Sequence, residues 1–413
     1  MNVARTVNAI ETDVKRLLDD HSVFQDPYPL LHRVREYSPA VAAGSFRFVT
    51  RYKDLVDGYR DERLSRQKGA QMEAAVHARD SSDQTLKDAR ESWTSMLINQ
   101  DEPAHKRIRR ILEVAFKPSR VAQWARMMED ITNELIDAVV GKQAFDFRKE
   151  LAYPLPERII CALMGVPYED HALWGAWTEA VVASARTKAP TDEIIEAVED
   201  AQRNFFLYFK KLVAERRQCL GEDLVSLMIR AESEGDRLSE LELLGALQML
   251  IQAGHETTAN LITNGMYTLL RHPDQYDRLR ADPSLVASAV EEMLRFESPA
   301  QWSLPRVAIE DVAFDSEVVP AGSVIVMALN AANRDPAIFE NPDQFDIERK
   351  NNRHVAFAAG PHFCLGNQFA RLEATTMFRA IMTRLPRLRL DGEPHFKSTF
   401  VRALDSLSVA VAE

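Results

Sequence analysis

The stretch Phe357-Ala358-Ala359-Gly360-Pro361-His362-Phe363-Cys364-Leu365-Gly366 holds one of the three cysteines of this chain. Its Gly-Pro pair favours a tight turn, and a helix-like run follows from Asn367 to Leu385. Cys364 is therefore expected at the entrance to a helix, where unpaired backbone N–H groups and the helix dipole favour an anion. A thiolate in such a position can ligate a soft metal or a haem iron. The same residues also suit a redox thiol or a buried core cysteine.

The composition is that of an ordinary globular protein, with 46% hydrophobic and 27% charged residues among 413. The net charge of −11, from 51 basic and 62 acidic residues, argues against general binding to nucleic acid or to an anionic membrane. The three cysteines lie far apart, which fits a reducing cytoplasm and disfavours a zinc site or a disulfide framework. We also expect no signal peptide and no membrane span, since no apolar core or long apolar window is seen.

Capping signals predict two long helices. Ser239, with Glu242 three residues later, forms a capping box that begins a helix expected to end at Arg271, just before a proline. Its middle is unusually apolar, which indicates a buried central helix. Asp282-Pro283 begins a second helix, which we expect to continue to Glu297.

The remaining patterns indicate a mainly α fold with small β-sheets. Valine- and isoleucine-rich runs predict short strands within 306–327, around a Pro-Ala-Gly turn. The other expected elements are a strand over 45–50, a helix over 51–60, a polar mobile loop with helical patches over 61–95, mostly helix over 102–237, and a small hairpin around Asp391-Gly392.

Polar residues interrupt the middle of the central helix at Ala253-Gly254-His255-Glu256-Thr257-Thr258. A glycine in a helix interior costs about 1 kcal/mol relative to alanine, and a threonine hydroxyl can bond back to a preceding carbonyl and loosen the turn. One interpretation is a widened turn that faces a bound ligand, with an acid and a hydroxyl that pass protons. The other is a small-residue contact with a crossing helix. The residues themselves favour neither.

Charged residues recur at helical spacing in two other places. Glu292 and Arg295 lie three apart and share a helix face. His105 and Arg109 lie four apart, and this pair suits a bound carboxylate because arginine can offer it two donors. Without other evidence, a solvated basic face is the favoured explanation of His105 and Arg109. Further isolated cations are Arg306 and His362.

Together, these motifs resemble the haem-thiolate monooxygenases, the cytochromes P-450, of the soluble bacterial kind, over nearly the whole chain. The turn at 253–257 matches the oxygen-activating turn, and Glu292 with Arg295 matches the Glu-x-x-Arg pair. Ala358 stands where the family often has glycine. The Cys-ligand loop is matched by Phe357, Gly360, His362, Cys364 and Gly366, and the segment before it by Asn333-Arg334-Asp335-Pro336, Phe339, Pro342 and Phe345.

The resemblance implies the cytochrome P-450 fold as a single domain over 1–413. Haem b (iron protoporphyrin IX) would lie between the long central helix and the C-terminal Cys-ligand loop and helix. Cys364 would be the thiolate axial ligand, with Leu365 and Gly366 tuning the sulfur through backbone N–H groups and Phe357 packed on the ligand side. The haem propionates would be bound by His105, Arg109, Arg306 and His362.

On the other side of the haem, the resemblance implies that Thr257 hydrogen-bonds oxygen and that Glu256 helps to deliver protons. Glu292 and Arg295 would form a structural network with Arg334. The implied reaction inserts one oxygen atom from O2 into a C–H bond or across a double bond and releases the other as water. Alternatives are a peroxide-driven haem-thiolate peroxygenase and a non-catalytic haem sensor, and the acid–hydroxyl pair argues against both.

The expected electron donors are a separate ferredoxin and ferredoxin reductase, because no fused redox domain or dinucleotide-binding glycine pattern is seen. We expect the ferredoxin to dock on the cysteine side, guided by Lys106, Arg110, Lys117, Arg349 and Arg353. The segments 61–95 and 170–195 are expected to gate access. An apolar or amphipathic substrate is expected in a pocket lined, by position, by Met249, Ala253, Trp302, Leu304, Phe400 and Val401.

Overall fold

The computed structural model describes residues 3–44, 46–77, 79, 81–114, 116–185, 191–231, 238–315, 317–397 and 401–412. The chain divides into two compact units. The first comprises Met1–Leu64, Trp124–Pro156 and Glu256–Glu413, and the second comprises Ser65–Gln123 and Glu157–His255. The expectation of a single domain over 1–413 stays a prediction.

The first unit combines helices with most of the strands, and the second is helical. Helices of the first unit are α1 (Val3–Asp19), α2 (Tyr28–Tyr37), α3 (Tyr52–Arg60), α13 (Pro273–Ala281), α14 (Val286–Phe296), α15 (Leu329–Ala332) and α16 (Asn367–Arg384). Helices of the second are α4 (Arg66–His77), α5 (Gln84–Thr94), α6 (Ala104–Glu113), α9 (His171–Ala185), α10 (Asp192–Gln218) and α11 (Leu224–Ala231). The chain passes between the units within β3 (Leu64–Ser65), α7 (Pro118–Val139), α8 (Pro154–Met164) and α12 (Glu240–Arg271).

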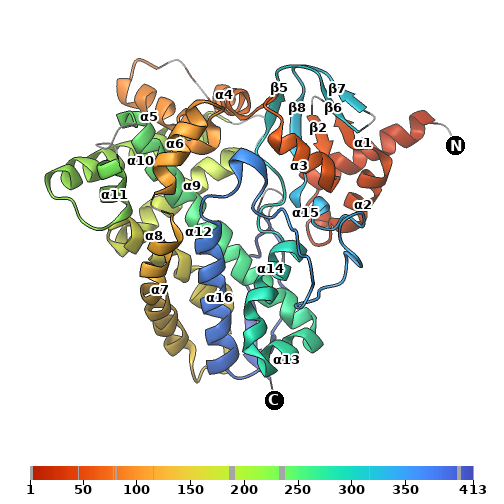
Figure 1. Ribbon diagram of the computed structural model, residues 1–413, viewed down its shortest axis with the longest axis vertical. Coiled ribbons are helices and arrows are strands. Elements are labelled where there is room, and N and C mark those ends of the chain that lie inside the picture. The colour runs from red at the N-terminus through yellow and green to blue at the C-terminus, as the bar shows by residue number, and fades with distance from the viewer. Residues whose placement is uncertain are drawn as a thin grey trace. The chain divides into compact units, whose positions relative to one another are not determined.

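The main sheet has the strand order β1-β2-β8-β5-β3, from β1 (Ala40–Ala43), β2 (Phe46–Val49), β8 (Val324–Met327), β5 (Arg306–Ala308) and β3 (Leu64–Ser65). Alternate residues of a strand point to opposite faces. Val41 and Phe48 pack with residues of α1 and α2 on one face, whereas Val49 and Ile325 pack with residues of α3 on the other. Both faces of the sheet are therefore buried by helices that neighbour it in Figure 1.

The central helix is confirmed as α12. The backbone N–H of Ser239 donates to Glu242 Oε2 at 2.8 Å, and the backbone N–H of Glu242 donates to Ser239 Oγ at 3.2 Å. This reciprocal pair is the capping box that the sequence indicates. The expected second helix is also confirmed, as a 3₁₀ turn over Pro283–Leu285 followed by α14.

The segment 61–95 is not mainly a loop, because α4 and α5 occupy much of it. Asp83 caps α5 by accepting a hydrogen bond from the backbone N–H of Thr85 at 2.9 Å. Leu86 and Ala89 of α5 are buried. The expectation of a mobile loop was wrong because the polar residues cover the outer sides of helices that bury only a narrow apolar face.

The expected hairpin around Asp391-Gly392 is also wrong. β9 (Leu388–Leu390) does pair antiparallel with β10 (Ser408–Val411), but a long connection over 391–407 separates the two strands. Pro394 follows closely after the expected turn, and a proline lacks the N–H that a ladder needs. β10 pairs on its other side with β4 (Ala144–Asp146), and β6 (Val312–Phe314) pairs with β7 (Glu317–Val319).

Candidate active site

The loop that carries Cys364 closes on itself immediately before α16. The backbone N–H of Cys364 donates to the carbonyl of Phe357 at 3.0 Å. Asn367, the first residue of α16, donates from Nδ2 to the Cys364 carbonyl at 2.7 Å. Cys364 is half-buried. The thiol is thus held by backbone contacts at the entrance to a helix, where the sequence predicts it.

Two glycines shape this loop in different ways. Gly360 has φ +65°, and a Cβ on it would lie 2.7 Å from the carbonyl oxygen of Tyr59 in α3, so the close approach of the two backbones requires glycine. A Cβ on Gly366, just before α16, would meet nothing within 4 Å. One side of the loop next to Cys364 is therefore open to an approaching group.

α12 is less buried at its polar interruption than in the stretches directly on either side of it. Residues 243–251 and 258–266 are buried, whereas 252–257 are half-buried, apart from Ala253, which is exposed. Glu256 and Thr257 belong to this accessible stretch. A half-buried stretch between two buried stretches of the same helix favours the interpretation in which the turn faces space for a ligand.

The Glu292–Arg295 pair lies on α14, and both side chains are 0% exposed. Arg295 donates from Nε to Glu292 Oε2 at 2.8 Å and from Nη2 to Glu292 Oε1 at 2.7 Å. It also donates to the carbonyls of Asn333 at 2.9 Å and Gln344 at 3.0 Å. Burial lowers the pKa of Arg295, an effect that the hydrogen bonds to Glu292 oppose. These contacts support the structural role expected for the pair.

The further arginine of this network is Arg349, and the expectation of Arg334 was wrong. Arg349 Nε donates to both carboxylate oxygens of Glu292 at 3.1 Å, whereas Arg334 donates to the carbonyl of Phe296 at 2.8 Å and to Asp343 at 3.2 Å. The Arg349 side chain is only 10% exposed, and its expected place on a ferredoxin-docking surface stays a prediction.

Two of the predicted propionate-binding cations belong to the first unit. Arg306 of β5 is buried, donates to the Leu64 carbonyl at 2.9 Å, and holds its guanidinium carbon 5.2 Å from the centre of the Tyr59 ring. His362 is half-buried in the 3₁₀ turn over Gly360–His362. Since the Tyr59 carbonyl also lies against Gly360, Tyr59 borders both Arg306 and the Cys364 loop.

The other two cations, His105 and Arg109, lie on α6 of the second unit. His105 is buried, and its Nδ1 lies 3.1 Å from Glu102 Oε1. Arg109 Nε donates to Glu113 Oε1 at 2.7 Å. The predicted role of this pair toward a propionate stays a prediction.

The predicted substrate-pocket residues differ in burial. Trp302 is buried in a core cluster of the first unit, with its ring centre 5.1 Å from that of Phe48. Phe400 lies outside the described residues. Of the other four, Met249 and Val401 are buried, Leu304 is half-buried and Ala253 is exposed. Substrate contact stays a prediction for all six residues.

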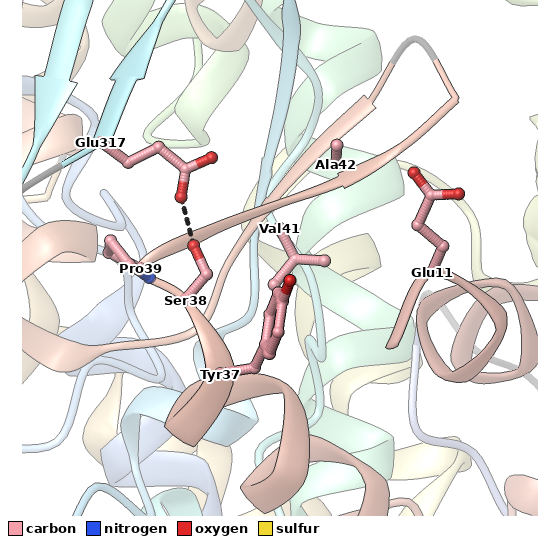
Figure 2. A pocket seen from close by; sticks show the side chains of 7 residues that line it. All are labelled: Glu11, Tyr37, Ser38, Pro39, Val41, Ala42 and Glu317. Carbon is pink, nitrogen blue, oxygen red and sulfur yellow. Dashed lines mark hydrogen bonds between the residues drawn. The ribbon is translucent and has the colours of Figure 1, made fainter. Parts of the chain in front are cut away.

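A pocket of about 490 Å³ lies elsewhere in the first unit, between α1, the end of α2, β1 and β7 (Figure 2). Ser38 Oγ donates to Glu317 Oε2 at one side of it, and Glu11 lies at the other side. None of the predicted site residues is among its lining residues, which are Glu11, Tyr37, Ser38, Pro39, Val41, Ala42 and Glu317.

Four residues that the sequence analysis missed contact the Cys364 loop or its neighbours. Glu291 of α14 accepts hydrogen bonds from Arg371 of α16, and His354 Nε2 lies 3.0 Å from Glu291 Oε2. Arg371 in turn donates to Asn367. The sequence signal for this set was weak, because its members come from three separate segments and form no recognisable spacing.

The residues at the Cys364 loop fit a haem iron. The donor is a single sulfur at a helix entrance, Phe357 supplies an aromatic ring in the same loop, and the side at Gly366 is open. Buried Arg306 lies nearby through Tyr59. Within the described ranges, no group of three or more His, Cys, Asp or Glu side chains could hold a metal ion.

None of the helices over the described residues has the length and apolar content that crossing a membrane requires.

Comparison with known proteins gives a consistent result. The family model described as "Cytochrome P450" matches residues 71–394. The chain is 36% identical over 379 residues to a cytochrome P450 of Bacillus subtilis (strain 168), covering 89% of each chain. It is 37% identical over 396 residues to the cytochrome P450 monooxygenase PikC of Streptomyces venezuelae, covering 93% of this chain and 91% of PikC.

Among solved structures, the chain is similar to P450BioI in complex with hexadec-9Z-enoic acid ligated acyl carrier protein. The TM-score is 0.85 at 30% identity, over 95% of this chain and 100% of that chain.

Proposed function

This chain belongs to the cytochrome P450 family, and from this premise we propose that it inserts one oxygen atom from O2 into an apolar or amphipathic small organic substrate, by C–H hydroxylation or by epoxidation. It is a cytochrome P450 monooxygenase, and the cofactor of this family is haem iron. We propose that the haem of this chain is haem b. The observation that carries the proposal is the Cys364 loop, in which one half-buried thiol is held at the entrance to α16 beside an open face at Gly366.

Cys364 is proposed to hold the iron through its sulfur, with the backbone of Leu365 and Gly366 beside it. When bound, haem iron supplies the oxygen-binding and O–O-cleaving chemistry that amino-acid side chains lack. The hydrogen bond from the Cys364 N–H to Phe357 and the one from Asn367 to the Cys364 carbonyl fix the backbone on both sides of the sulfur. Such contacts keep the sulfur in one position before the ligand bond forms.

Glu256 and Thr257 are proposed to handle protons. A carboxyl group can release and retake a proton, and a hydroxyl group can donate and accept a hydrogen bond at once. Their position on the accessible stretch of α12 supports this role, because water and substrate need access to both groups. Water held between the two side chains would carry the proton from the carboxyl to the hydroxyl.

The propionate carboxylates are proposed to be bound by Arg306 and His362 in the first unit. A carboxylate is the acceptor that arginine binds best, and Arg306 is near the Cys364 loop through Tyr59. His105 and Arg109 of the second unit have the same proposed role through the resemblance alone.

An apolar or amphipathic substrate is supported by the relatives as well as by the predicted pocket residues. P450BioI is described in complex with a hexadecenoic acid joined to an acyl carrier protein, which is a long apolar chain with a polar end. The predicted pocket of this chain includes Met249, Leu304 and Val401, which are likewise apolar.

Electrons are proposed to come from a separate ferredoxin that is reduced by a ferredoxin reductase, in the cytoplasm. The proposed guiding residues are Lys106, Arg110, Lys117, Arg349 and Arg353. Reversing the charge of Lys106 and Arg110 together is expected to slow electron transfer and to weaken its salt dependence. Unchanged rates and salt dependence would show that the ferredoxin docks elsewhere.

The test begins with a screen of apolar compounds for the shift in the visible spectrum that marks substrate binding to a haem protein. Hits are then turned over with ferredoxin, ferredoxin reductase and ¹⁸O-labelled O2. The expected product contains one labelled oxygen atom. A product that forms only when peroxide is added would indicate the peroxygenase, and tight binding without any product in either reaction would indicate the sensor.

A further inference from the structure

Glu291, next to Glu292 on α14, takes part in a separate set of contacts that reaches the Cys364 loop. We propose that Glu291 is a positioning residue that holds both ends of this loop, and with them the sulfur of Cys364, in the geometry that an iron ligand needs. The inference rests on the proposed function, since it assigns a role toward the same site. α14 and α16 lie side by side in the first unit (Figure 1).

One arm of contacts leads from Glu291 to the end of the loop. Arg371 of α16 donates from Nε to Glu291 Oε1 at 2.6 Å and from Nη2 to Glu291 Oε2 at 3.0 Å. The third nitrogen of the same guanidinium, Nη1, donates to Asn367 Oδ1 at 2.8 Å. Asn367 then donates from Nδ2 to the Cys364 carbonyl at 2.7 Å. Glu291 therefore reaches the backbone of Cys364 through two intervening side chains.

The second arm leads to the start of the loop through His354, whose side chain is only 3% exposed. The backbone N–H of Ala356 donates to His354 Nδ1 at 3.2 Å. A backbone N–H can only donate, so Nδ1 is the accepting nitrogen and the proton of the neutral ring lies on Nε2. His354 Nε2 lies 3.0 Å from Glu291 Oε2 and therefore donates to it. This arrangement fixes the backbone immediately before Phe357.

The two arms also meet at Phe357. The Arg371 guanidinium carbon lies 4.5 Å from the centre of the Phe357 ring, and the His354 ring centre lies 5.9 Å from it. The Phe357 carbonyl accepts the hydrogen bond from the Cys364 N–H. The Glu291 carboxylate thus orders Arg371 and His354. Both of these side chains lie against Phe357, whose carbonyl accepts the hydrogen bond that closes the loop. Arg371 also reaches the donor of that bond, Cys364, through Asn367.

The set is more than a surface ion pair, although Glu291 and Arg371 are 30% and 32% exposed. Arg371 binds Glu291 through two donors, a geometry that is stronger and more directional than a single contact. Burial acts to raise the pKa of Glu291, but the hydrogen bonds from His354 and Arg371 outweigh it and lower the pKa to about 2. Glu291 is therefore the charged acceptor of this set at neutral pH.

The experiment compares Glu291→Ala, Arg371→Lys and Arg384→Gln with the wild-type holoprotein. Three readouts are taken: hydrogen exchange of the amides in 354–366, the reduction potential, and the strength of the thiolate-type absorption band of the reduced, carbon-monoxide-bound form. Arg371→Lys keeps the positive charge but loses the forked geometry of the guanidinium. It therefore distinguishes an effect of the two-donor geometry from an effect of the charge. Arg384→Gln is the matched control, because Arg384 is also on α16 and pairs with a carboxylate, Asp137, far from the loop.

We expect Glu291→Ala and Arg371→Lys to speed exchange in 354–366 by about 10-fold, the factor for losing one charge-assisted hydrogen bond. Both should weaken the thiolate-type band, and Glu291→Ala should also raise the reduction potential because it leaves the Arg371 charge unbalanced. Arg384→Gln should change none of these. The proposal is overturned if Glu291→Ala and Arg371→Lys match Arg384→Gln in all three readouts, or if Arg371→Lys retains wild-type exchange.

Two further comparisons keep the result interpretable. Glu291→Gln retains the shape and one acceptor oxygen, so it is expected to fold even where Glu291→Ala does not, and its exchange in 354–366 should fall between wild type and Arg371→Lys. Exchange equal to that of the wild type contradicts the proposal. A wild-type protein without the thiolate-type band would instead overturn the proposed function, while hydrogen exchange would still test whether Glu291 holds the loop.

Discussion

Glu291 and Glu292 are neighbours on α14, yet their surroundings differ in almost every respect. Successive residues of a helix point about 100° apart, so the two carboxylates meet different partners. Glu292 is 0% exposed and binds Arg295 of its own helix together with Arg349. Glu291 is 30% exposed and binds Arg371 of another helix.

The difference shows how burial decides what a carboxylate does. A fully buried ion pair is costly to break, because removing one partner leaves a charge without solvent or counterion. A partly exposed pair contributes less to stability than a buried one but can still direct a side chain. Glu292 therefore stabilises the segment around Arg349, which precedes the Cys364 loop. Glu291 is suited to orient the loop itself.

The largest expected effect comes from breaking the buried network. Glu292→Ala should lower the free energy of unfolding by about 3–5 kcal/mol, because Arg295 and Arg349 would lose their shared acceptor. Denaturant unfolding followed by circular dichroism measures this. A loss below about 1 kcal/mol would mean that the two carboxylates do not differ as described.

A third carboxyl group sharpens the comparison, because it is buried like that of Glu292 but is not paired with arginines of the described ranges. Glu373 of α16 is buried, its Oε2 has no hydrogen-bond partner among the described residues, and burial raises its pKa to about 8. Because the folded state holds the proton that the unfolded state releases near pH 4.5, stability falls as the pH rises from about 4.5 to 8. Glu373→Gln should remove this loss and stabilise the protein by about 3 kcal/mol at pH 7.

The measurement is the unfolding free energy of wild type and Glu373→Gln at several pH values. The two proteins should be similar near pH 4 and diverge steadily up to pH 8. A constant difference over this range would show that Glu373 is already charged in the folded protein.

Glu291 should behave with the opposite sign. Its folded pKa of about 2 lies below the unfolded value of about 4.5, so its contribution is fully present above about pH 4.5 and is lost as the pH falls toward 2. After allowance for its partial exposure, we expect Glu291→Gln to lose about 1–2 kcal/mol relative to wild type at pH 6, and less at pH 3. A difference that stays the same between pH 6 and pH 3 would contradict this reading of the Glu291 contacts.

The smallest expected effect lies in the loop that Glu291 is proposed to hold. Ala358 has φ +61°, a left-handed conformation that costs a residue with a Cβ about 1–2 kcal/mol. Ala358→Gly should relieve this cost and raise the free energy of unfolding by about 0.5–1 kcal/mol, after the greater chain entropy of glycine is deducted. Thermal unfolding compares the two proteins, and a lower midpoint for Ala358→Gly would show that the methyl group packs favourably.

Local signals were enough to predict the long helices. The capping box at Ser239 and Glu242 begins α12 at the expected residue, because both partners lie within one turn. The strand β1 was missed because Ala40–Ala43 contains a single β-branched residue and relies on pairing with β2. The C-terminal pairing of β9 with β10 depends on a distant segment, which no local turn signal reveals.

The candidate site likewise combines features that local sequence predicts with features that depend on tertiary packing. The Cys364 loop could be predicted, since its Gly-Pro turn, cysteine and helix start are contiguous. The choice between Arg334 and Arg349 as a partner of Glu292 could not, because both arginines follow α14 and only the folded path decides which one meets the buried carboxylate. The contacts of Glu291 with His354 and Arg371 likewise join three segments that tertiary packing alone brings together.

The central claim, that the Cys364 sulfur holds haem iron, is tested most directly by the absorption band of the reduced, carbon-monoxide-bound protein in Cys364→Ser, with Cys219→Ser as the control. We predict that wild type and Cys219→Ser show the thiolate-type band and that Cys364→Ser loses it. A Cys364→Ser protein that keeps the band and binds haem as tightly as wild type would contradict the account.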